Sequence, residues 1–324
     1  MTKHPFDVSL VIPLFNEAES LPELTAWIDR VCKAESLSYE VLFINDGSTD
    51  ASWEIIAGLA KTFPTVRGTR FRRNHGKSAA LHVGFQQAQG EIVITMDADL
   101  QDSPEEIPGL VKGIREDGYD LISGWKKKRY DPLSKTLPTK LFNWAARKMS
   151  GIYLHDFNCG LKAYRLEVAQ AVEVQGEMHR YVPVLAKMAG YSKIGEQVVQ
   201  HQARKYGSTK FGMNRFVNGL LDLVTLSMVS RFQRRPMHFF GTWGVMMFLA
   251  SGLALATMGG LKLYRLAQGM RPGLVTEDPG FFIFLTTMIL GTQLFVTGLL
   301  AELMVRQSSK KVKYSIGEHI NSAS

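Results

Sequence analysis

Ile92-Val93-Ile94-Thr95-Met96-Asp97-Ala98-Asp99-Leu100-Gln101-Asp102 is the stretch from which the fold of this chain can be worked out. Its first five residues are β-branched or apolar, as is typical of a strand buried on both faces of a parallel sheet. The run stops at two carboxylates, Asp97 and Asp99, and Ser103-Pro104-Glu105-Glu106 opens the loop beyond them. Ligands of open parallel sheets lie beyond the carboxyl ends of the strands. The stretch therefore predicts a divalent-metal site facing a nucleotide, although an Asp-x-Asp pair alone is more often part of a solvated loop.

Strand and helix patterns alternate regularly along the first half of the chain. Strands are expected at residues 8–13, 39–44, 66–71, 91–96 and 120–124, and helices at residues 18–33, 51–61 and 77–88. Such alternation predicts an α/β fold with a doubly wound, largely parallel sheet. A domain of this kind takes about 200 to 230 residues, so a chain of 324 residues must contain something further.

Polar segments follow three of the predicted strands. They are Phe15-Asn16-Glu17, Asn45-Asp-Gly-Ser-Thr-Asp50 and Asp97-Ala98-Asp99. Each segment alone is most often a turn or a helix cap. Because the carboxyl ends of parallel strands meet at one edge of a sheet, we expect the three to form one site. A site with this many acids holds cations, so Mg²⁺ or Mn²⁺ with a diphosphate is the expected occupant.

Two long uncharged stretches follow the predicted α/β domain. Residues 239–261 and 279–301 contain no charged residue, and each reaches the roughly 20 residues that a helix needs to cross a bilayer. Neither stretch has a polar face to turn toward water, which favours a membrane hairpin over a pair of core helices. Basic residues flank the outer ends of the hairpin, whereas those in its loop are offset by Glu277 and Asp278. The positive-inside rule therefore places both termini in the cytosol.

Charge and cysteine content narrow the compartment and the partners. The net charge of +8 is explained by residues that flank the bilayer, so no nucleic-acid partner is required. Cys32 and Cys159 are far apart and have no C-x-x-C spacing, which argues for a reducing compartment and against a disulfide or zinc framework. Residues 1–7 lack the apolar region of a signal peptide, so we expect the first domain to stay in the cytosol.

Four motifs in order carry a specific resemblance. They are Val11-Ile-Pro-Leu-Phe-Asn-Glu17, Asn45-Asp-Gly-Ser-Thr-Asp50, Asn74-His-Gly-Lys77 and Asp97-Ala-Asp-Leu-Gln101. With the hairpin, the chain resembles family 2 glycosyltransferases of the GT-A fold, and among them the polyprenyl-phosphate glycosyltransferases. That group contains dolichol-phosphate mannose synthase and bacterial undecaprenyl-phosphate sugar transferases. The resemblance covers nearly the whole chain and implies a nucleotide-sugar donor, a polyprenyl-phosphate acceptor, Mg²⁺ or Mn²⁺, and self-association into a homo-oligomer.

The resemblance also implies a role for particular residues in the donor site. The residues that match positions holding the nucleoside are Pro13, Phe15, Glu17, Ile44 and Asp46. Asp97 and Asp99, with Ala98 between them, match the pair that binds the donor diphosphate through the metal, and Gln101 matches a further metal ligand. Lys77 matches a basic residue near the nucleotide. A P-loop interpretation of Gly76-Lys77-Ser78 fails, because position 71 is Phe71 where that motif needs a glycine.

Two further segments are expected to face the acceptor. Asp156 matches an acidic residue near the acceptor and is, with Asp99, the candidate catalytic residue. A general base is not required, because a phosphate monoester with a second pKa of about 6 is already largely ionised at neutral pH. Arg204, Ser208 and Lys210 lie in a segment that matches an Arg-x-x-Gly-x-Ser-Lys pattern almost fully, with Thr209 between the serine and the lysine. They are expected to bind phosphate oxygens, although a basic membrane-surface loop would also explain them. His155 and His179 are rival acid–base candidates, but a lone histidine is more often structural.

The sequence thus predicts four parts. They are a cytosolic GT-A domain (residues 1–212), an amphipathic juxtamembrane segment (213–237), a two-helix transmembrane hairpin (238–305) and a basic cytosolic tail (306–324). The expected activity is inverting transfer of a single sugar from a UDP- or GDP-sugar to undecaprenyl or dolichyl phosphate, at the cytosolic face of the bacterial inner membrane. The sugar and the nucleotide stay open.

Two other functions are weighed against this one. A non-catalytic nucleotide-sugar-binding scaffold at the membrane would have no need of intact Asp97, Asp99 and Asp156. A processive polysaccharide synthase would carry a Gln-x-x-Arg-Trp segment, which Gln233-Arg-Arg-Pro does not match, and two spans are too few for a polymer channel.

Overall fold

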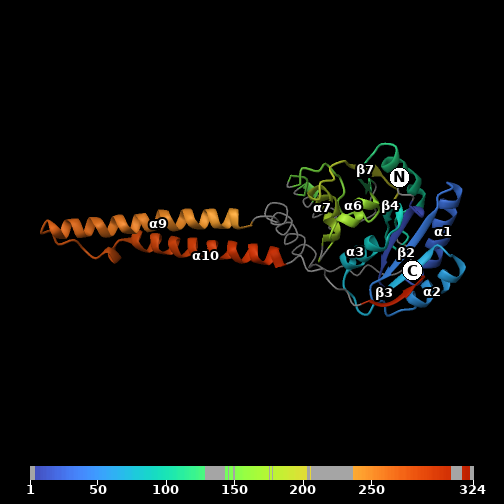
Figure 1. Ribbon diagram of the computed structural model, residues 1–324, viewed down its shortest axis with the longest axis horizontal. Coiled ribbons are helices and arrows are strands. Elements are labelled where there is room, and N and C mark those ends of the chain that lie inside the picture. Colours follow the sequence, from blue (N-terminus) through green and yellow to red (C-terminus); the bar gives the residue numbers. More distant parts are fainter. Residues whose placement is uncertain are drawn as a thin grey trace. The chain divides into compact units, whose positions relative to one another are not determined.

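The computed structural model describes residues 4–127, 143–144, 146–148, 150–174, 176, 178–202, 205, 236–307 and 316–321. The chain divides into two compact units, one of residues 1–230 and 313–324 and one of residues 231–312. The first unit is an α/β domain and the second is a helical hairpin (Figure 1).

A mixed sheet forms the centre of the α/β unit. Its strands, among the described residues, are β1 (Phe6–Leu14), β2 (Tyr39–Asn45), β3 (Val66–Phe71), β4 (Gly90–Thr95), β5 (Leu121–Trp125), β6 (Lys162–Arg165), β7 (Ile194–Val198) and β8 (Ile316–Ile320). Their order across the sheet is β7-β5-β6-β4-β1-β2-β3-β8. Strands β1 to β4 pair in parallel, as do β5 and β7, whereas β6 and β8 run antiparallel to their neighbours. The predicted largely parallel α/β sheet is confirmed.

Helices cover both faces of this sheet. They are α1 (Leu21–Ala34), α2 (Ser52–Thr62), α3 (Lys77–Gln87), α4 (Ile107–Arg115), α6 (Leu166–Ala171) and α7 (Val182–Met188), with the short 3-10 helices η1 (Pro104–Glu106) and η2 (Met178–Tyr181). Side chains of α1, α2 and α4 pack with Leu10 and Ile12 of β1, and side chains of α3, α6 and α7 pack with Val11. Alternate residues of β1 thus enter different cores, which explains why the strand is apolar at nearly every position.

Two local features differ from the expected elements. The loop expected after Asp102 is helical, because the Ser103 side chain accepts a hydrogen bond from the Glu105 N–H at 3.3 Å and caps η1, which leads directly into α4. The first helix begins at Leu21 rather than residue 18, because the Ala18 N–H donates to Asp50 Oδ2 at 3.2 Å. That bond ties residue 18 to the loop after β2.

The C-terminal stretch expected to be a basic tail contains strand β8, which the sequence did not predict. This strand pairs antiparallel with β3 at one edge of the sheet. Trp53 Nε1 donates to Glu318 Oε2 at 2.5 Å, and Thr69 Oγ1 lies 3.1 Å from His319 Nδ1. Strand β8 therefore covers backbone groups of β3 that would otherwise form an open edge.

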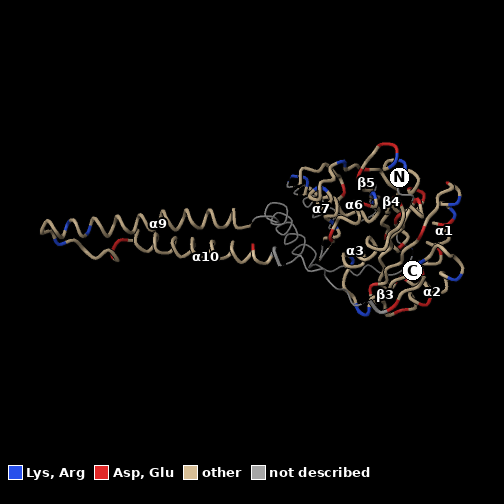
Figure 2. The backbone as a smooth tube through the Cα atoms, in the orientation of Figure 1, with Lys and Arg blue, Asp and Glu red and all other residues tan. Residues whose placement is uncertain are grey.

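The second unit consists of α9 (Pro236–Ala267) and α10 (Pro279–Gln307), joined through η3 (Val275–Glu277). Both helices are long and apolar enough to cross a membrane, and they contain the two predicted spans. Figure 2 shows charged residues only towards the ends of these helices. The helices approach closely at two glycines, since a Cβ on Gly244 would lie 2.6 Å from the Gly291 carbonyl oxygen. Most of the predicted juxtamembrane segment lies outside the described residues.

Candidate functional site

The register of the sheet brings the polar strand ends together. In β1 and β2, Pro13 pairs with Ile44, and in β1 and β4, Val11 pairs with Thr95. The segments that follow these three parallel strands therefore emerge at one edge of the sheet. Strand β6 starts at the same edge, because it is antiparallel and its Lys162 pairs with Thr95.

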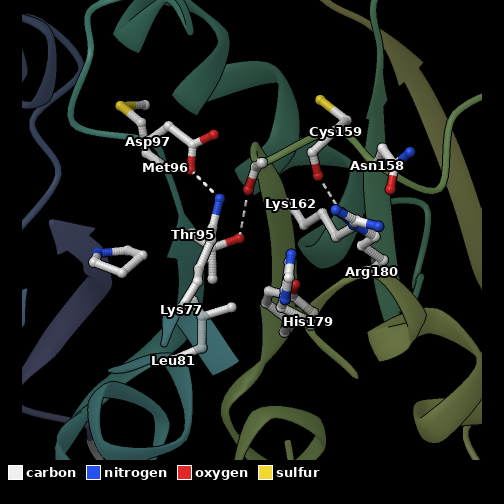
Figure 3. A pocket seen from close by; sticks show the side chains of 13 residues that line it. Lys77, Leu81, Thr95, Met96, Asp97, Asn158, Cys159, Lys162, His179 and Arg180 are labelled. Carbon is white, nitrogen blue, oxygen red and sulfur yellow. Dashed lines mark hydrogen bonds and ion pairs between the residues drawn. The ribbon is translucent and has the colours of Figure 1, made fainter. Parts of the chain in front are cut away.

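A pocket of about 400 Å³ lies beside the end of β4 (Figure 3). Its walls come from β1, the start of α3, the end of β4, the segment leading into β6, and η2. The lining residues are Pro13, Lys77, Leu81, Thr95, Met96, Asp97, Asn158, Cys159, Gly160, Lys162, Tyr164, His179 and Arg180. Three of the residues predicted to bind the donor, Pro13, Lys77 and Asp97, therefore lie at one pocket.

Asp97 is held in place from two sides. The Lys77 ammonium group donates to Asp97 Oδ1 (Figure 3), and a Cβ on Gly160 would lie 2.6 Å from Asp97 Oδ2. Burial alone would raise the pKa of Asp97, but the positive charges of Lys77, Lys126 and Lys162 outweigh it and lower the pKa to about 2. The carboxylate is therefore ionised at neutral pH.

The turn after Asp97 has a defined shape. Leu100 adopts a left-handed backbone conformation with φ of 61°, and Asp99 Oδ1 accepts the Gln101 N–H at 3.2 Å. The next residue, Asp102, is fully buried and pairs with Lys126 Nζ at 2.7 Å. This ion pair fixes the far end of the turn to the residue that follows β5.

The side chains on this turn fit a divalent cation bound together with a diphosphate. Asp97, Asp99 and Gln101 offer hard oxygen ligands within five consecutive residues. Among the described residues, no group of three His, Cys, Asp or Glu side chains is placed to hold a metal without other ligands. Mg²⁺ is commonly held by only one or two protein carboxylates, with substrate phosphates completing its shell. The residues present therefore suit a metal that arrives with the nucleotide.

Asp46 performs a structural task at the end of β2. Its two carboxylate oxygens accept the backbone N–H groups of His75, at 2.7 Å, and Gly76, at 2.9 Å. Burial raises the pKa of Asp46, although these hydrogen bonds oppose the shift. Gly47 follows with φ of 72°, and a Cβ there would lie 2.6 Å from the backbone of Arg73. Asp46 thus anchors the loop that delivers Lys77 to the pocket.

The other predicted nucleoside residues lie in different environments. Ile44 is fully buried among α3 side chains, whereas Phe15 is about one-third exposed. The backbone N–H of Glu17 donates to Ser52 Oγ at 3.2 Å. The loop carrying Phe15 and Glu17 is therefore tied to the segment after β2 and stays at the sheet edge.

Asp156 lies behind the pocket wall rather than on it. The residue is 1% exposed, and its Oδ1 accepts the Asn158 N–H at 3.0 Å. Its own N–H and that of His155 donate to Glu196 Oε1 at 3.0 and 2.7 Å. Asp156 and Glu196 therefore shape the segment from Asn158 to Gly160, which does line the pocket.

Sequence reasoning missed two cations of this pocket, Lys162 and Arg180. Lys162 is buried and donates to the Cys159 carbonyl oxygen, and burial lowers its pKa. Only the antiparallel pairing of β6 with β4 brings Lys162 to the site, and a four-residue strand gives no periodic signal. The predicted phosphate ligands Arg204, Ser208 and Lys210 lie outside the described residues.

His179 is placed at the pocket but is not a base at neutral pH. The backbone N–H of His179 donates to Ser78 Oγ at 3.0 Å, and its ring atom Nδ1 lies 3.2 Å from the same oxygen. Burial, with the nearby charges of Lys77, Arg180 and Lys162, lowers the pKa of His179 to about 3. The other candidate, His155, pairs with Glu196 at 2.7 Å and stacks on Trp125.

The α/β unit has a fold of the GT-A type, which it shares with solved structures. Glucosyl-3-phosphoglycerate synthase from Mycobacterium tuberculosis matches with a TM-score of 0.54 and 18% identity over 70% of this chain and 80% of that one. Mannosyl-3-phosphoglycerate synthase from Rubrobacter xylanophilus matches with a TM-score of 0.55 and 17% identity, over 69% of this chain and 74% of that one. A structure of the first enzyme contains Mn²⁺ and UDP-glucose, with a TM-score of 0.52.

The sequence profile of the family named Glycosyl transferase family 2 matches residues 9–172, and the chain belongs to that family. Dodecaprenyl-phosphate galacturonate synthase of Rhizobium johnstonii is 34% identical over 93% of this chain and 88% of that protein. Undecaprenyl-phosphate 4-deoxy-4-formamido-L-arabinose transferase of Aeromonas hydrophila is 34% identical over 98% of this chain and 94% of that protein. The predicted family and glycosyltransferase activity are confirmed.

Proposed function

We propose that this enzyme transfers one sugar from a UDP- or GDP-sugar to a polyprenyl phosphate, with inversion at the anomeric carbon. The observation that carries the proposal is the ionised Asp97 on the turn after β4, beside a pocket lined by lysine and arginine. The two relatives described above are named for a polyprenyl-phosphate acceptor and match more than nine-tenths of this chain, hairpin included. Both substrates are anionic, which suits a cationic pocket.

The donor lies along the edge formed by β1, β2 and β4 in this proposal. Pro13, Phe15 and Glu17 contact the nucleoside, while Ile44 and Asp46 support it from beneath. Asp97, Asp99 and Gln101, with Ala98 between the acids, hold Mg²⁺ or Mn²⁺. When bound, the metal supplies positive charge that stabilises the departing nucleoside diphosphate.

The acceptor needs little acid–base help. A phosphate monoester has a second pKa of about 6, so its attacking oxygen is already ionised at neutral pH. His179, with its pKa lowered to about 3, is too weak a base to contribute. Asp156 acts by shaping the segment from Asn158 to Gly160, and Arg204, Ser208 and Lys210 bind phosphate oxygens. Catalysis then consists mainly of positioning two anionic partners and stabilising charge.

The hairpin anchors the enzyme so that the acceptor phosphate reaches the α/β unit from the bilayer. Strand β8, which follows α10 in the sequence, belongs to the same sheet as β1, which precedes α9. Two spanning helices return the chain to the side on which it began, so this pairing supports placement of both ends of the hairpin on one side of the membrane. The positive-inside rule makes that side the cytosol, as proposed for a bacterial inner-membrane enzyme. Because of the family resemblance, the proposal also includes self-association of the chain into a homo-oligomer.

The test measures transfer from labelled UDP- and GDP-sugars to undecaprenyl or dolichyl phosphate by membranes that contain the full chain. Labelled lipid that extracts into organic solvent is the expected product. Asp99→Asn removes a charge with little change in size and should abolish transfer, whereas Glu54→Gln on the exposed side of α2 should not. Normal turnover by Asp99→Asn would overturn the metal-binding role, and absence of labelled lipid with every donor would overturn the proposed function.

A further inference from the structure

One strongly polar side chain interrupts the apolar surface of the helical hairpin. Gln293 is the only residue with an amide, acidic or basic side chain in the two uncharged stretches, residues 239–261 and 279–301. It is the middle residue of α10 (Pro279–Gln307), so it lies about 20 Å from either end of that helix. The hydrocarbon core of a bilayer is roughly 30 Å thick, which places the Gln293 amide inside this core when α10 crosses the membrane.

The Gln293 side chain points away from α9. Helix α10 contacts α9 through Gly291, where a Cβ would lie 2.8 Å from the Gly244 carbonyl oxygen, and through Gly298, where a Cβ would lie 3.0 Å from the Phe240 Cβ. Two residues correspond to about 200° of helical rotation, so Gln293 lies almost opposite Gly291 on α10. The side chain is exposed, and its amide has no hydrogen-bond partner in the described part of the chain.

Gln293 lines a shallow groove of about 530 Å³ on this outward side of α10. The groove is formed by Ile289, Thr292, Gln293, Val296 and Thr297, which we call the Gln293 face. These residues follow the spacing i, i+3, i+4, i+7 and i+8, which is typical of a helix face that packs against another helix. The Thr297 hydroxyl donates to the backbone carbonyl oxygen of Gln293 at 2.8 Å, and its own oxygen can still accept a hydrogen bond.

An unpaired amide is unfavourable in hydrocarbon. Lipid tails offer no donor or acceptor, so the N–H groups and the carbonyl oxygen of the Gln293 side chain gain hydrogen bonds only from another polar group at the same depth. Glutamine side chains form such bonds between neighbouring helices in membrane proteins. The Gln293 face therefore suits a partner helix within the bilayer.

A second copy of this chain supplies the polar group that the amide needs. Copies inserted in the same orientation have parallel α10 helices, so their Gln293 residues lie at the same depth. An amide is complementary to itself, because its N–H donates to the carbonyl oxygen of an identical amide and its own carbonyl oxygen accepts in return. A two-fold axis along the membrane normal brings the two side chains together in this arrangement.

We propose that the Gln293 face joins two copies of this chain, through reciprocal hydrogen bonds between the two Gln293 amides in a parallel pair of α10 helices. The inference rests on the proposed function, because it takes α9 and α10 as membrane-spanning, and it assigns a surface to the self-association included there. Gly291 packs against Gly244 within each hairpin. Contacts within a hairpin and contacts between copies therefore use different sides of α10.

The first experiment measures association of the purified full chain in phosphatidylcholine vesicles. Energy transfer between donor-labelled and acceptor-labelled copies is followed while added lipid dilutes them, which gives the Kd of the dimer. Gln293→Leu removes the amide and should raise this Kd about tenfold, because two hydrogen bonds between helices are lost in each dimer. Gln268→Leu is the matched control. Its amide already donates to Tyr264 Oη at 2.6 Å, so the Kd should stay unchanged.

A second experiment locates the contact by cross-linking while Gln293 is intact. Thr297→Cys places a thiol on the Gln293 face, whereas Leu299→Cys places one at nearly the same depth but about 160° away around α10. Both positions are exposed, and the native Cys32 and Cys159 are buried. Oxidation with copper phenanthroline in the same vesicles should link Thr297→Cys into disulfide dimers and leave Leu299→Cys monomeric.

Three outcomes would overturn the inference. A chain that is monomeric at every lipid dilution would show that the copies do not associate. An unchanged Kd in Gln293→Leu would show that the amide does not join them. Cross-linking of Leu299→Cys at least as strong as that of Thr297→Cys would place the contact on another side of α10.

Failure of the proposed function looks different from failure of this interface. If α9 and α10 do not span the membrane, alkaline carbonate extracts the unmodified chain from membranes. If the chain is not the proposed transferase, no labelled lipid forms with any donor, whatever its state of association. The Kd and the cross-linking pattern report on the Gln293 face alone.

Discussion

Gly160 and Asp97 pack so closely that a single methyl group does not fit between them: a Cβ on Gly160 would lie 2.6 Å from Asp97 Oδ2. Asp97 follows β4 and Gly160 lies in the segment that leads into the neighbouring strand β6, and Thr95, at the end of β4, donates to the Gly160 carbonyl oxygen. The position of the carboxylate thus depends on the absence of a side chain at residue 160.

Gly160→Ala should therefore reduce transfer strongly. The added methyl group pushes the Asp97 carboxylate away from its place at the end of β4, and a displacement of about 1 Å at a reacting site can lower the rate roughly a hundredfold. The turnover number for lipid-linked sugar is the measurement. Gly58→Ala is the control, because a Cβ there meets nothing within 4 Å, and it should retain full activity. Equal activity of both variants would show that Asp97 tolerates the shift.

The ion pair between Lys77 and Asp97 predicts competition between a lysine and a metal. Lys77 neutralises Asp97 when no nucleotide is bound, so Mn²⁺ alone must displace it. Lys77→Met should therefore tighten the binding of Mn²⁺ alone. The same variant should weaken the binding of the nucleotide diphosphate, because the ammonium group of Lys77 is expected to turn towards the diphosphate when the nucleotide binds. Titration followed by the electron paramagnetic resonance signal of Mn²⁺ measures the first effect, and Lys112→Met, on the exposed face of α4, should leave it unchanged. Weaker Mn²⁺ binding by Lys77→Met would contradict the competition.

The parts of this site that the sequence predicted share one physical property. Asp46 and Asp97 lie within two residues of the ends of β2 and β4, and in a parallel sheet such positions meet at one edge whatever the details of packing. Lys162 reaches the same edge only because β6 reverses direction, a choice made by long-range pairing with β4. Arg180 arrives on a short 3-10 helix without a pattern of its own.

The remaining differences also come from tertiary contacts. The motif singles out Asp156, but it does not predict that the carboxylate accepts the backbone N–H of Asn158, two residues ahead. Strand β8 is short and follows the helical hairpin of α9 and α10, so nothing local distinguishes it from a polar tail. Its pairing with β3 depends on contacts more than 200 residues apart in the chain, such as that between Trp53 and Glu318.

His179 should contribute to the pH dependence of stability and not to that of the reaction. Its pKa is lowered from 6.5 to about 3 in the folded chain, so between these values the unfolded chain binds more protons. The free energy of unfolding therefore rises with pH through this window, and this contribution to stability is lost as the pH falls from 6.5 towards 3. In the variant His179→Gln, the free energy of unfolding should therefore fall less as the pH is lowered through this window.

Two measurements check this expectation. The thermal midpoint of the full chain in detergent, recorded from pH 4 to pH 7, should vary less in His179→Gln than in the unmodified chain. The transfer rate from pH 6 to pH 9 should keep its shape, because His179 is neutral throughout that range. Loss of an acidic limb in the rate profile would instead indicate that the imidazole exchanges a proton during the reaction.

The contact between Gly244 and Gly291 predicts which surface joins the two apolar helices. In lipid, helices associate through close packing of small residues rather than through the hydrophobic effect. Gly244→Leu places a large side chain where a Cβ would already lie 2.6 Å from the Gly291 carbonyl oxygen, so α9 and α10 must separate. Overpacking of this kind destabilises by about 1–3 kcal/mol, which should lower the thermal midpoint of the full chain. Gly252→Leu, at a position of α9 where a Cβ meets nothing within 4 Å, should leave it unchanged. If both variants behave alike, the helices do not meet at Gly244.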